Sequence, residues 1–369
     1  LEQYVRCPFS YFLRYGLRLK EREMPQVSRL DDGNVLHEIL EEAGEWFRAL
    51  WGEGADRSEE ELREYVARLC ENKKEEYSVY QTTGRYRYYW RRLQETAGYA
   101  VRILSEQLAA GQFKPEAFEW SFGRGKSRPV EIPLSDGTVI RLQGKIDRVD
   151  ILRRADGDYL RIIDYKSGKT SYSEADVYAG LQLQLPIYME AALESGTLTG
   201  TGKGRPAGIF YFHLTPMLQK GTNGLGEQEK SQLLQKQGRL EGLLLEDRVI
   251  AESMDCGLAD EPRVLRAALT KSGAFRSSDR TATAGQFRQL RQFVRGKVAE
   301  AAEKIRSGQM KARPMESGQR LPCTYCTFRG ACRFDERLPG AETGCVEELK
   351  SGEFWQRLEE EIKKEGTLE

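Results

Sequence analysis

Two aspartates and a lysine near the middle of the sequence have the types and spacing of a metal site. Asp147 lies in one run of apolar residues, and Asp164 and Lys166 lie in the next. Carboxylate oxygens are preferred ligands of Mg2+ and Mn2+, and a nearby lysine can stabilise developing negative charge. On an exposed sheet the same residues would form a salt bridge of roughly 0.2–1 kcal/mol. Their apolar neighbours favour central strands, where unpaired charges are costly unless they hold a metal.

A hairpin between the two apolar runs would place these side chains on one face. Asp156 and Gly157 lie between the runs, and an Asp-Gly pair is the strongest short signal for a two-residue turn. With this turn, Asp147 lies opposite Lys166. Since strand side chains alternate, Asp147, Asp164 and Lys166 then project the same way. A shift of one residue would turn Asp147 away from the other two.

Three cysteines near the end of the sequence, in the pattern Cys323-x2-Cys326-x5-Cys332, are spaced as ligands of one soft metal centre. Such a centre generally needs four ligands, and Cys7 and Cys345 are both candidates for the fourth. The chemistry of thiolates alone leaves zinc and an iron–sulfur cluster equally open. The total of seven cysteines does not suit a secreted disulfide framework.

Residues 33–50 predict a helix, because their apolar residues recur at three- and four-residue spacings. The helix carries His37, one of only two histidines in the chain. A lone helical histidine is more often a core or surface residue than a ligand. The other histidine, His213, lies in an apolar run and is expected to be structural.

The central hairpin resembles the RecB-like branch of the PD-(D/E)XK nuclease superfamily. The segment GKIDRVD (residues 144–150), followed by Asp164, Tyr165 and Lys166, is similar to its second and third motifs. The resemblance implies an α/β (α+β) fold of the restriction-endonuclease type, with a central mixed sheet flanked by helices. It also implies that Asp147, Asp164 and the carbonyl of Tyr165 bind Mg2+ or Mn2+, while Lys166 acts in catalysis.

Two more segments extend this resemblance. The pattern Gly33-x2-Leu36-His37 is similar to the first motif, whose helix histidine reaches the metal, so His37 becomes an expected ligand. Gln184 and Tyr188 lie on one face of a helix expected at residues 173–194. They resemble the Q-x3-Y motif that the branch places beside single-stranded DNA, although Tyr188 could simply pack on the sheet. Pro186, between them, predicts a kink or a late helix start.

The two ends of the sequence resemble the iron–sulfur staple of AddB-type nucleases. The segment Y-x2-C-P around Cys7 and the three late cysteines match that family in residue type and spacing. The resemblance implies a 4Fe-4S cluster held by Cys7, Cys323, Cys326 and Cys332. Such a cluster would join the two ends of the domain.

We expect a single domain of residues 1–369. Residues 1–32 form an N-terminal segment with the first cluster cysteine, and residues 33–110 form a helical region. The nuclease core follows at residues 118–214. Residues 217–310 form a helical insertion with a long helix, and residues 321–345 hold the cysteine cluster. Strands are expected at residues 118–122, 130–134 and 207–214, and further helices at 287–310 and 346–364. No chemistry is assigned to residues 217–283.

The composition makes any nucleic-acid surface a local feature. Lys and Arg total 57, as do Asp and Glu, so the net charge is zero. Residues 84–92 contain four arginines, four aromatic residues and no acid, which suits either single-stranded nucleic acid or an amphipathic helix with an aromatic core face. With no membrane-spanning run and no signal-peptide pattern, a cytoplasmic location is expected. The start at Leu1 indicates a piece of a longer chain.

The resemblance implies a Mg2+- or Mn2+-dependent deoxyribonuclease, an exonuclease that hydrolyses single-stranded DNA. AddB-type proteins cut the 5′-terminated strand during double-strand-break processing for homologous recombination, in a heterodimer with an AddA-type helicase–nuclease partner. Two alternatives stay open. One is a stand-alone RecB-like exonuclease of the CRISPR-associated type, and the other is an iron–sulfur DNA-binding module without catalysis.

Overall fold

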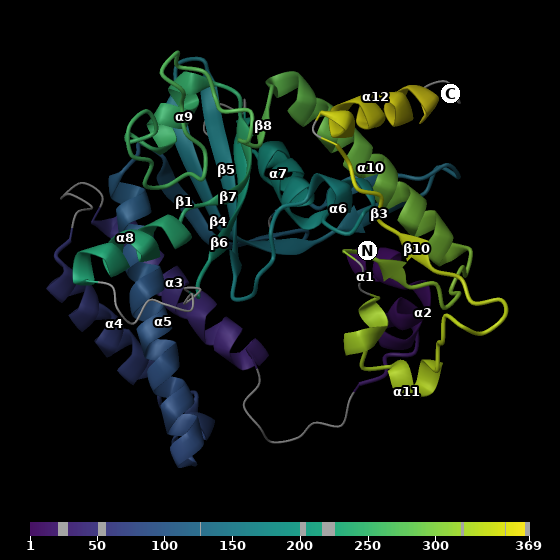
Figure 1. The fold of residues 1–369 in the computed structure, drawn as a ribbon, viewed down its shortest axis with the longest axis horizontal. Coiled ribbons are helices and arrows are strands. Elements are labelled where there is room, and N and C mark those ends of the chain that lie inside the picture. Colours follow the sequence, from purple (N-terminus) through teal and green to yellow (C-terminus); the bar gives the residue numbers. More distant parts are fainter. Residues whose placement is uncertain are drawn as a thin grey trace.

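A mixed six-stranded sheet forms the centre of the protein (Figure 1). In sheet order its strands are β1 (Lys114–Phe122), β4 (Gly144–Arg154), β5 (Gly157–Lys166), β6 (Gly204–His213), β7 (Glu241–Leu245) and β8 (Thr281–Ala282). Neighbouring strands are antiparallel except for β5–β6 and β7–β8, which are parallel. This computed structural model describes residues 1–20, 29–50, 57–125, 127–199, 204–215, 226–318, 321–350 and 352–365.

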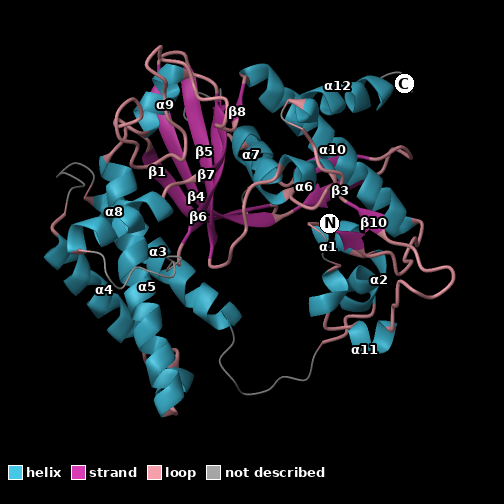
Figure 2. Cartoon of the chain, in the orientation of Figure 1, coloured by secondary structure: helices cyan, strands magenta, loops and turns pink. Residues whose placement is uncertain are grey.

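Two groups of helices cover the two faces of the sheet (Figure 2). The first group consists of α3 (Arg29–Ala49), α4 (Glu59–Lys73), α5 (Gly84–Ala109) and α8 (Glu227–Gln237), with the short 3-10 helix η3 (Ser78–Gln81). The second consists of α6 (Glu174–Tyr178), α7 (Gln184–Glu194), α10 (Ala284–Arg306) and α12 (Glu353–Glu365). A further helix, α9 (Arg248–Met254), follows β7. The expected α/β class, with a central mixed sheet between helices, is confirmed.

Strands β4 and β5 are buried along most of their length, as strands covered on both faces must be. On the face toward α5 they carry a buried ion cluster instead of a purely apolar surface. Asp150 accepts hydrogen bonds from Arg148 (2.6 Å) and Arg161 (2.7 Å), and Arg148 also donates to Gln107 of α5 (3.1 Å). The polar residues of the motif GKIDRVD therefore divide between two faces, and Arg148 and Asp150 hold the sheet to α5.

The helix predicted at residues 33–50 is α3, which begins at Arg29 and packs across β1. Gly44 permits this packing, because a Cβ at that position would lie 2.1 Å from the ring of Phe118. Close approach of α3 to β1 brings His37 to the end of the sheet where β4 begins.

The single helix predicted at residues 173–194 is wrong, since the chain forms two helices, α6 and α7, with a break between them. Pro186 lies in the first turn of α7, where a missing N–H is tolerated, so the late helix start that it predicted is confirmed. Glu2 supports this start: its carboxylate accepts hydrogen bonds from the backbone N–H groups of Leu183 (2.6 Å) and Gln184 (2.9 Å).

Residues expected only as a helical insertion also contribute to the central sheet. Strands β7 and β8 lie inside residues 217–310 and extend the sheet beyond β6. Both are short, which makes them hard to separate from loops by sequence pattern. The long helix expected at residues 287–310 is confirmed as α10, whereas α12 begins only at Glu353, later than the predicted 346.

A smaller part of the molecule joins the two ends of the chain. It contains α1 (Glu2–Arg6), α2 (Pro8–Tyr11), the π-helix η1 (Phe12–Gly16), the parallel pair β9 (Met315–Glu316) and β10 (Gly344–Cys345), the 3-10 helix η5 (Pro322–Tyr325) and α11 (Arg329–Cys332). We call residues 1–16, 309–318 and 321–345 the cysteine lobe. The backbone N–H of Phe9 donates to Lys311 (3.2 Å), and the hydroxyl of Tyr4 donates to the carbonyl of Gln309 (2.8 Å).

A separate antiparallel hairpin precedes β4. It consists of β2 (Val130–Pro133) and β3 (Val139–Leu142) and packs against α10. The strands predicted at 118–122, 130–134 and 207–214 are thus confirmed as β1, β2 and β6. Of the helices that the structure describes, none combines the length and apolar character needed to cross a membrane.

Candidate active site

The turn between β4 and β5 is formed by Ala155 and Asp156, so the predicted Asp156-Gly157 turn is wrong by one position. Gly157 instead opens β5, where its φ of 144° suits glycine. Moving the turn by one residue changes each pairing by two residues, which keeps every side chain on its face. Arg148 pairs with Ile163, and continuing this register puts Asp147 beside Asp164 instead of opposite Lys166.

The two aspartates meet where the β4–β5 ladder ends. The carboxylate of Asp147 accepts a hydrogen bond from the backbone N–H of Tyr165 (2.6 Å). Both aspartate side chains are almost fully buried. The hydrogen bond fixes Asp147 against the residue that lies between Asp164 and Lys166, so the predicted metal residues lie at the same end of the hairpin.

A chain of polar contacts runs from Asp164 to α7. Lys166 Nζ lies 2.6 Å from Asp164 Oδ2 and donates to Gln184 Oε1 (3.1 Å). Gln184 Nε2 in turn donates to the hydroxyl of Tyr188 (3.0 Å). Gly144 leaves room for this tyrosine, because a Cβ there would lie 3.2 Å from its ring. The structure therefore brings together four predicted residues from β5 and α7.

His37 reaches the site from α3. Its Nδ1 lies 3.4 Å from Asp147 Oδ1 and 3.3 Å from Glu119 Oε1. The ring of His37 also meets the ring of Tyr165 edge-on, with 5.4 Å between their centroids. Its position beside Asp147 agrees with the ligand role that the family resemblance implies, and this role stays a prediction.

Glu119 of β1 is a further carboxylate at the site, outside the motifs that the sequence predicted. Its neighbours Phe118 and Trp120 pair with Arg148 and Ile146, which places Glu119 beside Asp147. Glu119 has a φ of 47°, an uncommon value for a residue other than glycine and one often found at functional sites. Its carboxylate also forms an ion pair with Lys145. Only the register of three strands reveals this position, and the local sequence contains no motif for it.

The buried acids have displaced pKa values. Burial raises the pKa of Asp164 to about 7, and the charge of Asp147 adds to the shift, while Lys166 opposes it. Burial disfavours the protonated form of His37, but hydrogen bonds and charge from Asp147 and Glu119 outweigh this and raise its pKa to about 10. For Glu119, burial is outweighed by His37 and Lys145, which lower the pKa of the carboxyl group.

These residues fit a divalent cation. Ligand atoms of His37, Glu119 and Asp147 all lie within 4.8 Å of one another. Asp164 lies outside this group, and its buried Oδ2 is paired with Lys166 Nζ at 2.6 Å. The donors around the site are therefore carboxylates and one imidazole, which is a donor set that a divalent cation accepts. Oxygen ligands suit Mg2+ or Mn2+, and an imidazole favours Mn2+.

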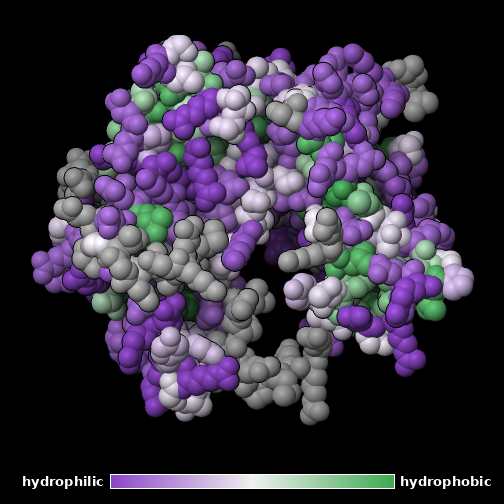
Figure 3. Space-filling view, viewed as in Figure 1, coloured by the Kyte–Doolittle hydropathy of each residue, from purple (hydrophilic) through white to green (hydrophobic). Residues whose placement is uncertain are grey.

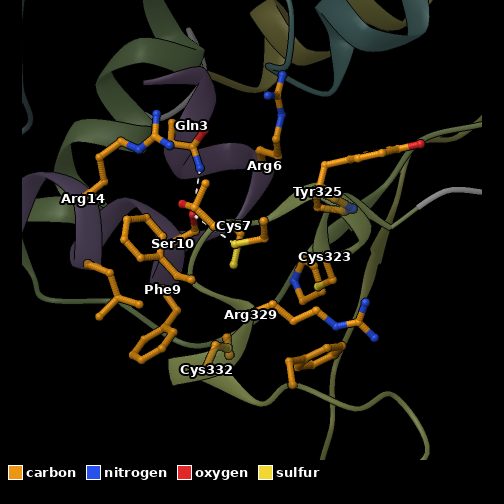
Figure 4. A pocket seen from close by; sticks show the side chains of 18 residues that line it. Gln3, Arg6, Cys7, Phe9, Ser10, Arg14, Cys323, Tyr325, Arg329 and Cys332 are labelled. Carbon is orange, nitrogen blue, oxygen red and sulfur yellow. Dashed lines mark hydrogen bonds between the residues drawn. The ribbon is translucent and has the colours of Figure 1, made fainter. Parts of the chain in front are cut away.

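The four cysteines of the family pattern line one cavity of about 390 Å³ in the cysteine lobe (Figure 4). Cys345, the other candidate for the fourth ligand, is exposed and does not line this cavity. Burial raises the pKa of the Cys7 and Cys323 thiols, and the neighbouring cysteines add to the shift. Geometry thus groups Cys7 with the late triplet.

The segment 84–92 divides between core and surface. Trp90 is buried and packs against Tyr80, whereas Tyr88 is exposed, as are the arginines of this segment. His213 is buried, lies 3.1 Å from the carbonyl of Gly168 and takes no part in the site, as expected. The first turns of α5 therefore combine an aromatic core contact with a basic exposed face.

Proton competition should control metal binding. Because the folded pKa of Asp164 is raised, its protonated form stabilises the metal-free protein at acidic pH, and this contribution is lost as pH rises through about 7. A cation requires the ionised carboxylate. Apparent Mn2+ affinity, measured by calorimetric titration, should increase at least about tenfold from pH 6 to pH 8.

Asp164→Asn should abolish Mn2+ binding, and Glu60→Gln, at an exposed position, should not. Equal affinity at both pH values would contradict this assignment.

Comparison with known proteins identifies the family of the chain. A family model of the PD-(D/E)XK nuclease superfamily matches residues 1–333. Two similar relatives carry the same name, which describes one of the subunits of an ATP-dependent helicase/deoxyribonuclease. The chain is 34% identical over 374 residues to the relative from Thermoanaerobacter sp. (strain X514), and 33% identical over 371 residues to the one from Clostridium acetobutylicum. Each alignment covers 99% of this chain but 32% of the relative, so the chain spans about a third of their length. The chain belongs to the PD-(D/E)XK nuclease superfamily.

Proposed function

We propose that this chain is the nuclease part of an AddAB-type helicase–nuclease and hydrolyses single-stranded DNA with the help of Mg2+ or Mn2+. It would act as an exonuclease on the 5′-terminated strand during double-strand-break processing, beside an AddA-type partner. The observation that carries the proposal is a series of polar contacts across the site. Asp147 accepts a hydrogen bond from Tyr165 N–H, Asp164 forms an ion pair with Lys166, and Lys166 donates to Gln184. The relatives, named as part of an ATP-dependent helicase/deoxyribonuclease, support the cellular role.

Asp147, Asp164, the carbonyl of Tyr165 and His37 would hold the divalent cation, with Glu119 close enough to contribute. A cation at this position supplies the charge that activates the attacking water and polarises the scissile phosphate. The acids therefore have to remain ionised during turnover. Hydrogen bonding of Asp147 to Tyr165 N–H keeps one carboxylate oriented without using a side-chain donor.

Lys166 supplies positive charge at the reacting phosphate. Asp164 and Gln184 hold its ammonium group from two sides, and the ring of Tyr211 lies 5.3 Å from Nζ. A cation fixed before the reaction stabilises developing charge without reorganisation. The same contacts place Gln184 and Tyr188 beside the lysine, where they would position the DNA strand.

We further propose that Cys7, Cys323, Cys326 and Cys332 hold a 4Fe-4S cluster. All four side chains line one cavity, which places four thiols where they could share one metal centre. The match of Cys7 and the late triplet to the AddB-type pattern favours an iron–sulfur cluster over zinc. Such a centre would hold α1 against the late cysteine segment.

Substitution of Lys166 tests the catalytic assignment. Lys166→Ala should lower kcat on a single-stranded oligonucleotide by about 100-fold or more, because a preorganised charge at the phosphate is lost. Binding of the oligonucleotide should change little. Lys169→Ala, three residues further in the exposed loop, provides the matched control and should keep wild-type turnover. Wild-type kcat for Lys166→Ala would remove the basis of the proposed mechanism, and undiminished cleavage by Asp164→Ala would do the same.

The cluster proposal predicts a difference between two cysteines at the opposite ends of the lobe. In anaerobically purified protein, Cys7→Ser should lose the brown iron–sulfur absorbance and most of the bound iron. Cys345→Ser should retain both, since Cys345 lies outside the cavity. Metal analysis that finds zinc in the wild-type protein, or iron loss on substitution of Cys345 alone, would contradict the assignment.

A further inference from the structure

We infer that Arg6 and Tyr325 of the cysteine lobe form a binding subsite for one nucleotide beside the active site. The two residues would hold one nucleotide of the single-stranded substrate, with its phosphate on Arg6 and its base on the ring of Tyr325. The inference rests on the proposed function and adds to it a substrate contact made by the two ends of the chain.

Helix α1 is fixed in relation to the catalytic groups. Glu2 caps α7, and its carboxylate accepts hydrogen bonds from the backbone N–H groups of Leu183 and Gln184. Arg6 lies four residues after Glu2 and therefore on the same side of the helix. The cap that positions Gln184 thus also directs the end of α1 toward Lys166.

A cavity of about 360 Å³ connects the lobe to the site. Arg6 and Tyr325 line it from the cysteine lobe, and Lys166, Gln184 and Tyr211 line it from the nuclease core. Figure 4 shows the side chains of Arg6 and Tyr325 extending away from the cysteines. Figure 3 shows the molecule hollowed between the helical side and the cysteine lobe. The substrate-facing lysine and the two lobe residues therefore share one space.

Both lobe residues are available for a ligand. Arg6 is exposed and forms no hydrogen bond or ion pair with the described residues. Tyr325 lies between two of the cysteines, yet 82% of its surface is exposed. The acids of the cavity have other partners: Glu2 accepts two backbone N–H groups, and Asp176 accepts the hydroxyl of Ser317 (3.1 Å). Arg6 is thus the free cation of the lobe side of this cavity, within the described residues.

This combination selects unpaired nucleic acid. A guanidinium group binds a phosphate, and an exposed phenol ring stacks on a base only when that base is free of its complement. Stacking contributes about 1–3 kcal/mol per base and tolerates any sequence. A duplex could not offer a base to Tyr325 without opening. The subsite therefore favours a DNA strand that has already been separated from its complement.

Substitution of Tyr325 tests the stacking contact. Tyr325→Ser should weaken binding of a fluorescein-labelled oligothymidylate about tenfold in EDTA, and should raise KM similarly in Mg2+ while kcat stays within about twofold. Tyr325→Phe keeps the ring and should bind as the wild type does. Tyr15→Ser, another exposed tyrosine of the lobe, is the matched control. Wild-type affinity and KM for Tyr325→Ser would overturn the inference.

Substitution of Arg6 tests the phosphate contact. Arg6→Gln should reduce the slope of log K against log salt by about 0.7, the value for one phosphate of a single strand, whereas Arg6→Lys should keep it. Arg14→Gln changes an exposed arginine that lines the cysteine cavity and not the one shared with Lys166, so it serves as the control and should leave the slope unchanged. An unchanged slope for Arg6→Gln would overturn the inference. Because binding is measured in EDTA, a wild-type protein that binds but never cleaves would reject the nuclease proposal separately.

Discussion

The placement of two buried carboxylates side by side is the constraint on which the rest of this structure depends. Asp147 and Asp164 lie together where β4 and β5 part, and burial, with the charge of Asp147 as a smaller contribution, raises the pKa of Asp164. Neighbouring groups reduce the repulsion between the two carboxylates. His37 of α3 lies beside Asp147, Lys166 of β5 forms an ion pair with Asp164, and the backbone N–H of Tyr165 donates to Asp147. The proposed cation would balance the remaining negative charge, and the superfamily to which this chain belongs consists of nucleases.

The polar contacts also explain why distant segments are needed for one small site. Helix α7 carries Gln184 and Tyr188, and its first turn is capped by Glu2 at the beginning of the chain. The cysteine lobe then ties that beginning to the segment around Cys323. On the other face of the sheet, the ion cluster around Asp150 fixes β4 and β5 to α5. The site is therefore stabilised from both faces and from both ends.

Side-chain alternation made the face of the candidate site predictable from sequence, and it tolerated an error in the turn. Gly157 was expected in the turn but opens β5, and because the pairing changed by two residues, Asp147 and Asp164 stayed on one face. Glu119 could not be assigned, because its place beside Asp147 depends on three paired strands and on a positive φ. The short strands β7 and β8 have too few residues for a periodic pattern. The position of Arg6 at the cavity that Lys166 also lines depends on the tertiary contact of Glu2 with α7, which no local motif encodes.

A single cation is expected between His37, Asp147 and Asp164, and the position of that cation is the most direct test of the proposed site. Crystals soaked in Mn2+ should show a single strong anomalous peak at the manganese edge, with ligand distances to both aspartates and a contact to the Tyr165 carbonyl. A peak held by Glu119 on the Lys145 side of the site without Asp164, or the absence of any peak near the β4–β5 hairpin, would contradict this placement.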